Sequence, residues 1–161
     1  MRMNIRKLTE KLYEIGRKLE NYEKSLLSSS VTGALLGITE GIFTPWRYFP
    51  KIKTTIPYIN LHIHAYDILF TWPIYTLGAS LPYIRERKVF KNLKYILSNI
   101  WFSMVIEEVV FFLLNKRLPS PTDVTSSTGY IPLGEYCIPI WWIIYSSLPI
   151  YFYFRRKKKE H

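Results

Sequence analysis

Four long apolar segments, separated by charged connections, set the strongest limit on what this chain can fold into. Each has about the 20 residues that a helix needs to cross the hydrocarbon core of a bilayer. Although 48% of the residues are hydrophobic, the charged residues collect at the chain ends and between these segments. Such segregation is typical of membrane proteins. The sequence therefore predicts an all-α, polytopic membrane protein in which residues 26–154 form a bundle of four transmembrane helices, with spans at about 26–43, 57–81, 94–114 and 136–154.

Both ends of the chain are predicted to be cytoplasmic. In residues 1–25, apolar side chains recur at alternating spacings of three and four between basic ones, which predicts an amphipathic N-terminal helix. This helix could lie on an anionic membrane surface, pair with a second copy, or pack on the bundle. Together with the connection 82–94 and the basic tail 155–161, it holds 17 of the 22 lysines and arginines. Because basic connections stay on the cytoplasmic side, we expect a multi-pass protein of the cell membrane with both termini inside.

The charge and cysteine content exclude two other classes. The net charge of +10 does not indicate a nucleic-acid partner, because the basic residues flank apolar segments and form no stripe with interleaved aromatics. The single cysteine, Cys137, excludes both an intrachain disulfide and a cysteine-rich metal site. The lipid bilayer is the partner that the composition favours.

Three glycines of the first segment recur every four residues: Gly33, Gly37 and Gly41. A helix face without side chains lets another helix approach backbone to backbone. The glycine face could hold a homo-oligomer together or pack inside one chain. Glu40 lies on nearly the same side, so we expect its carboxylate to point into a helix contact.

A polar stretch in the second segment is the best candidate for a functional site. If residues 57–81 are helical, Asn60, His64, Asp67 and Thr71 fall at i, i+4, i+7 and i+11 and share one face. Ionisable groups inside a bilayer are costly and usually face a protein interior or a water-filled cavity. With the predicted orientation, this face lies in the outer half of the bilayer.

Carboxylates from two other segments reach a similar depth. Glu40 lies near the outer end of the first span, and Glu107 and Glu108 lie about 10–12 Å below the outer end of the third. Mixed nitrogen and oxygen donors suit a divalent transition metal such as zinc, iron or manganese. The sequence therefore predicts a site with His64, Asp67 and Glu108 as metal ligands. Glu40 and Glu107 are the predicted catalytic residues, with Asn60 in support and Glu108 the more interior of the glutamate pair.

Three functions fit this arrangement. A metal-dependent enzyme that acts on a lipid or another membrane-embedded substrate is the first. A proton-coupled or ion transporter that uses the same residues is the second, because carboxylates and histidine form proton relays within membranes. A non-catalytic membrane assembly protein is the third. Residues 116–135, rich in proline, serine and threonine, are predicted to form a cap or lid over the outer side.

Overall fold

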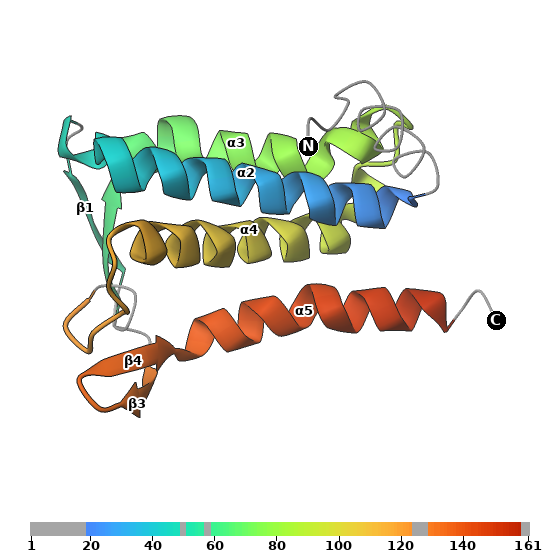
Figure 1. Ribbon diagram of the computed structural model, residues 1–161. Helices are drawn as coiled ribbons and strands as arrows, with labels where there is room; N and C mark the ends of the chain where they lie inside the picture. The colour runs from blue at the N-terminus through green and yellow to red at the C-terminus, as the bar shows by residue number, and fades with distance from the viewer. Residues whose placement is uncertain (1–18, 49–50, 57–58, 124–128, 159–161) are drawn as a thin grey trace, which may run out of the picture.

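Four α-helices dominate the part of the chain that the structure, a computed structural model, describes: residues 19–48, 51–56, 59–123 and 129–158. They are α2 (Asn21–Phe43), α3 (Trp72–Ile84), α4 (Leu93–Leu114) and α5 (Ile140–Lys157). Helix α2 packs against both α3 and α4, whereas α5 packs mainly on α4 (Figure 1). The short helical elements η1 (Pro45–Tyr48), η2 (Asp67–Thr71) and η3 (Phe90–Asn92) join them. The expectation of a mostly helical chain is confirmed.

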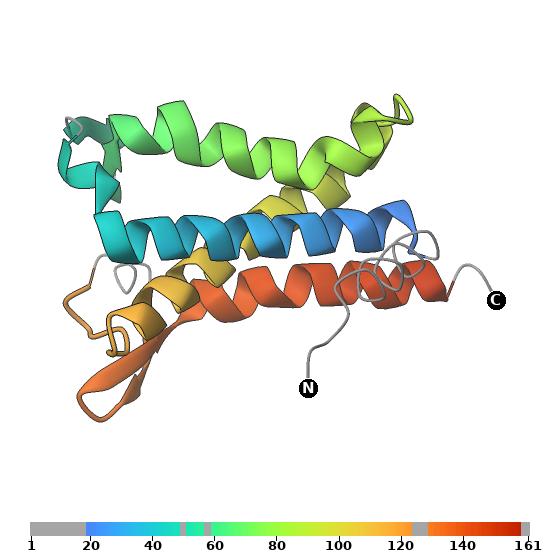
Figure 2. The same ribbon diagram turned by 45° about the horizontal axis from the view of Figure 1, so that its top comes forward.

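Two β-hairpins lie together at one end of the helices, which we call the hairpin end (Figures 1 and 2). Strand β1 (Lys51–Ile56) pairs antiparallel with β2 (Ile59–His64), and β3 (Tyr130–Leu133) pairs antiparallel with β4 (Tyr136–Pro139). The opposite end, which we call the turn end, holds the start of α2, the α3–α4 connection and the end of α5. Helices α2 and α4 therefore run parallel, and α3 and α5 run back.

The second predicted span is shorter than expected, because its first part is a strand. Residues 59–64 form β2, and the helical conformation begins only at Ala65. The local sequence Ile-Asn-Leu-His-Ile-His alternates apolar and polar residues with the period of two that suits a strand. The predicted helix face that joined Asn60 and His64 to Asp67 and Thr71 is therefore wrong.

The fourth predicted span also begins as a strand. Residues 136–139 form β4, and α5 starts at Ile140. A two-residue turn joins β3 to β4, and Gly134 has φ +67° there, a conformation that hairpin turns of this length require. The predicted loop 116–135 thus contains strand β3. Its partner β4 is hydrogen-bonded to the loop after α4 through the Cys137 N–H and the Pro119 carbonyl oxygen at 2.9 Å.

The first and third predicted spans correspond to α2 and α4. Helix α2 begins at Asn21, so residues 21–25 of the predicted amphipathic helix belong to α2. Most of the rest of that predicted helix lies outside the described residues. A capping box starts α2, in which the Glu20 backbone N–H donates to Glu23 Oε2 at 3.0 Å. Of the described helices, only Asn21–Phe43 and the joined Phe90–Leu114 are long and apolar enough to cross a bilayer.

Large apolar side chains are exposed on the outer faces of the helices, and buried polar side chains lie among the apolar ones of the interior. Leu35, Ile42 and Phe43 on α2 have 59%, 61% and 65% of their surface exposed. Much of the interior is polar, and its polar members are Ser25, Ser29, Thr71, Ser80, Ser98, Asn99, Ser103 and Glu107. Small and hydroxyl-bearing residues are favoured between helices in membranes, where apolar side chains gain nothing by turning inward.

Candidate functional site

Helices α2 and α4 approach each other closely along the glycine face. A Cβ atom at Gly33 would overlap the Ser103 carbonyl oxygen, and one at Gly37 would overlap the Glu107 carbonyl oxygen. Backbone contact of this kind is the reason for small residues at every fourth position. The structure thus shows the alternative in which the glycine face packs inside one chain.

The carboxyl groups of Glu40 and Glu107 meet at this contact, near the hairpin end. They hydrogen-bond each other, and Glu107 is only 8% exposed. An ionised carboxylate can only accept hydrogen bonds, so this bond requires a proton on one of the two groups. Asp67, at the start of η2, interacts electrostatically with both. We call Glu40, Asp67 and Glu107 the carboxyl cluster; it joins α2, α4 and the start of the α3 helix.

The arrangement of η2 explains how Asp67 reaches the cluster. Residues Asp67–Thr71 form one turn of π-helix, in which the Trp72 N–H donates to the Asp67 carbonyl oxygen. Pro73 follows at the beginning of α3 and has no N–H to continue the regular α-helical pattern. The change in backbone hydrogen bonding lies directly before Pro73. Single π-helical turns recur at functional sites.

Glu108 faces a different neighbour from Glu107. The Trp142 Nε1–H of α5 donates to Glu108 Oε2 at 3.0 Å, and the Trp142 ring lies 6.0 Å from that of Phe112. Adjacent residues point about 100° apart on a helix, so only one of the two glutamates can face α2. The expectation that Glu108 is the more interior residue is wrong, because Glu107 occupies the α2–α4 contact.

The predicted metal centre is not supported by the described side chains. Among them, no three or more histidines, cysteines, aspartates or glutamates are arranged to hold a metal ion. The backbone of His64 and Asn60 belongs to β2, but their side chains lie outside the described part of the chain. Of the predicted site residues, the structure brings Glu40, Asp67 and Glu107 together and places Glu108 toward α5.

Sequence reasoning missed a series of polar residues that continues from the carboxyl cluster toward the turn end. Ser103 Oγ donates to the Ser29 carbonyl oxygen at 2.8 Å, and Asn99 Nδ2 donates to Ser25 Oγ at 2.8 Å. The four-residue spacing of the glycines extends backward to Ser29 and Ser25. The same spacing relates Asn99, Ser103 and Glu107, so this signal was present in the sequence.

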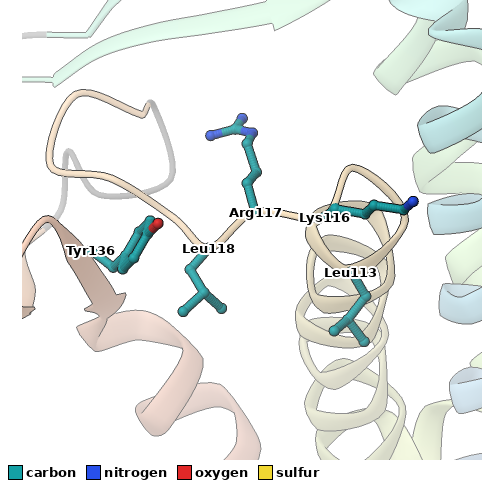
Figure 3. Close-up of a pocket in the computed structure, with 5 residues that line it drawn as sticks. All are labelled: Leu113, Lys116, Arg117, Leu118 and Tyr136. Atoms are coloured by element: carbon teal, nitrogen blue, oxygen red, sulfur yellow. The ribbon is translucent and has the colours of Figure 1, made fainter.

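A shallow pocket at the hairpin end is separate from the carboxyl cluster. It measures about 260 Å³ and is lined by Leu113, Lys116, Arg117, Leu118 and Tyr136 (Figure 3). Arg117 is held by Asp123 through hydrogen bonds of 2.8 and 3.1 Å. The pocket lies between the end of α4 and the β3–β4 hairpin, and no carboxylate lines it. We do not assign it to the functional site.

Comparisons of the chain with protein-family models, curated proteins and solved structures give no match. The geometry of the side chains is therefore the basis for a functional proposal. Its central feature is the contact between two carboxyl groups on parallel helices.

Proposed function

We propose that this protein is an ion transporter of the cell membrane whose transported ion is the proton, with the Glu40–Glu107 pair as its proton-binding site. The outward-facing apolar residues and the polar interior support insertion in a bilayer. Two helices have the length and hydropathy of a span. In this proposal, the continuous helical run 65–84 and α5 supply the other two spans.

The turn end is the cytoplasmic side in this arrangement. It carries the basic residues Arg85, Arg87, Lys88, Lys91, Lys94, Arg155 and Arg156. Excess lysine and arginine mark the cytoplasmic side of membrane proteins. The carboxyl cluster then lies in the outer half of the bilayer, below the two hairpins.

One observation supports proton transport above all others: the hydrogen bond between Glu40 and Glu107. Two adjacent carboxyl groups in a poorly solvated site share a proton, because they cannot both ionise without strong repulsion. Release of that proton leaves two negative groups on facing helices, with Asp67 nearby. Proton occupancy is thereby coupled to the contact between α2 and α4, and such a link between binding and conformation is what a transporter of protons needs.

Proton flux into proteoliposomes tests this proposal. A potassium gradient with valinomycin supplies the driving force, and an enclosed pH-sensitive dye reports the flux. We expect the wild type to conduct protons and both Glu40→Gln and Glu107→Gln to lose most of the flux. The matched control is Glu86→Gln, an exposed glutamate at the turn end whose partner is Lys88 at 2.8 Å. Wild-type flux in both glutamine variants would overturn the proposal.

Elemental analysis of the same preparations separates the other two functions. A stoichiometric zinc, iron or manganese ion that is lost in His64→Ala and Glu108→Ala would replace proton transport with the metal-dependent enzyme, whose substrate is a lipid or another membrane-embedded molecule. A folded protein with neither flux nor metal would also contradict the proposal and favour the assembly role, in which the pair only holds α2 on α4.

A further inference from the structure

Below the carboxyl cluster, three helices contribute buried polar side chains to one shared interior. Each of these residues is at most 4% exposed. They are Ser25 and Ser29 on α2, Thr71 directly before α3, Tyr75 and Tyr83 on α3, and Asn99 and Ser103 on α4. We call this set the polar stripe. On each helix its members are separated by four residues or a multiple of four, which keeps them on one face.

Hydrogen bonds between the helices show that the three faces meet. Asn99 on α4 donates to Ser25 Oγ, which in turn donates to the Ala79 carbonyl oxygen of α3 at 2.5 Å. One turn closer to the carboxyl cluster, Ser103 Oγ donates to the Ser29 carbonyl oxygen. The next residue at this spacing on α4 is Glu107, so the polar stripe leads directly to the carboxyl pair.

The polar stripe is long enough to span most of a bilayer. From Glu40 to Ser25 the helix rises about 22 Å, against a hydrocarbon core of about 30 Å. It begins at the carboxyl pair and ends close to Tyr22, whose hydroxyl donates to the Pro149 carbonyl oxygen of α5 at 2.6 Å. The stripe therefore connects the proposed proton site with the turn end.

Several polar atoms of the stripe lack a hydrogen-bond partner within the described residues. Among them are Ser29 Oγ, the Tyr75 hydroxyl and Asn99 Oδ1. A buried polar group without a partner costs about 1–3 kcal/mol, so native proteins satisfy such groups with water or a ligand. Alanine in place of Ser29 and phenylalanine in place of Tyr75 would let α2 pack on its neighbours without this cost. A structural role alone does not explain these hydroxyls.

Close helix packing restricts what can move along the stripe. The backbones of α2 and α4 touch at Gly33 and Gly37, so a solute or a hydrated metal ion cannot pass unless the helices separate. Hydroxyl groups and single water molecules can still pass a proton by exchanging O–H bonds.

We propose that the polar stripe conducts protons between the Glu40–Glu107 pair and the cytoplasmic side, an inference that rests on the proposed transport function. The shared carboxyl O–H bond breaks as a water oxygen forms a new O–H bond. At each hydroxyl, including those of Tyr75 and Ser103, the oxygen accepts one proton from a water molecule, and the original O–H proton passes to the next water molecule toward the turn end. The carboxylate left behind takes a proton from the outer side, so the protein is unchanged after each transfer.

Two conservative variants test the path. Tyr75→Phe and Ser103→Ala each remove one hydroxyl and keep the packing, and flux is measured in proteoliposomes as above. The matched control is Ser80→Ala on α3, because Ser80 is 5% exposed but donates to the Thr76 carbonyl oxygen of its own helix at 2.5 Å. Infrared titration of the protonated carboxyl band reports the state of the Glu40–Glu107 pair independently of flux.

We expect both path variants to conduct fewer protons than Ser80→Ala, with the carboxyl band titrating as in the wild type. Wild-type flux in both Tyr75→Phe and Ser103→Ala would overturn the path and leave the proton site intact. If the wild type conducts no protons, or shows no protonated carboxyl band lost in Glu107→Gln, the transport function fails and the path fails with it. Should one variant not fold, the other still decides between these outcomes.

Discussion

A Cβ atom on Gly37 would overlap the carbonyl oxygen of Glu107, so α2 and α4 touch backbone to backbone beside the carboxyl pair. The contact fixes how far the Glu40 and Glu107 side chains must reach to meet. Any residue larger than glycine at position 37 pushes the helices apart at the level of the proposed proton site. A substitution of Gly37 should therefore change both the stability of the folded protein and proton binding by the pair.

Gly37→Ala should destabilise the protein by about 1–3 kcal/mol, the usual cost of overpacking a tight contact. The same change should weaken the Glu40–Glu107 hydrogen bond and reduce proton flux. Gly41→Ala is the control, because the atoms nearest to its Cβ belong to the Leu114 side chain, which can move. Thermal unfolding in detergent measures the stability of both variants, and the proteoliposome assay measures their proton flux. Equal melting temperatures for the two variants would mean that α2 and α4 do not touch as described.

The hydrogen bond between Trp142 and Glu108 should contribute measurably to the docking of α5. Trp142→Phe removes the donor and Glu108→Leu removes the acceptor, and hydrogen bonds between membrane helices contribute about 0.6 kcal/mol, with values up to about 1.7. A double-mutant cycle on unfolding free energy isolates the pair, because once one partner is gone, loss of the other should cost less. Purely additive effects would show that the bond contributes nothing.

The sequence was sufficient to predict the helical character of the chain and to single out Glu40, Asp67 and the Glu107–Glu108 pair as carboxylates at a similar depth. The length of the apolar segments and the segregation of charge indicate the helices. The helical rise per residue places the carboxylates of the three segments at one depth. The strand at 59–64 was missed because its alternating pattern lies inside a longer apolar run, where the helical reading was preferred.

The choice between Glu107 and Glu108 depends on a contact that single-helix geometry does not contain. Rotation about the α4 axis is set by the close approach of Gly33 and Gly37, and this approach turns Glu107 toward α2. The polar stripe was missed for a related reason. Serine and asparagine within apolar segments show no clear pattern until the glycine spacing of α2 and the glutamate spacing of α4 are considered together.

Cysteine labelling should show that the hairpin end is extracellular. Wild-type Cys137 is 2% exposed, so a membrane-impermeant maleimide should leave it unmodified and give a low background. In whole cells, Glu135→Cys in the β3–β4 turn should be labelled, whereas Arg87→Cys in the α3–α4 connection should react only after the membrane is opened. The reverse pattern would invert the orientation and place the carboxyl cluster in the inner half of the bilayer.

The loop after α4 should remain ordered until strongly acidic pH. Partial burial alone raises the pKa of Asp123, but hydrogen bonds from Arg117 and Ser120 outweigh it and hold the pKa below its usual value. Because the folded-state pKa is the lower one, the stabilisation is fully present above the unfolded pKa of about 3.9 and is lost as pH falls through the folded value. Binding of the β3–β4 hairpin to this loop should then be insensitive to pH near neutrality.

Amide hydrogen exchange at Cys137, corrected for the intrinsic effect of pH, reports whether the hairpin stays bound to the loop after α4, because the Cys137 N–H donates to the Pro119 carbonyl oxygen. Protection should be constant from neutral pH down to about pH 5 and fall only well below that. In Asp123→Asn, the neutral side chain loses its ion pair with Arg117 at every pH, so protection at neutral pH should already be low. Full protection in that variant would show that the loop is held by backbone contacts alone and that the Arg117–Asp123 pair is dispensable.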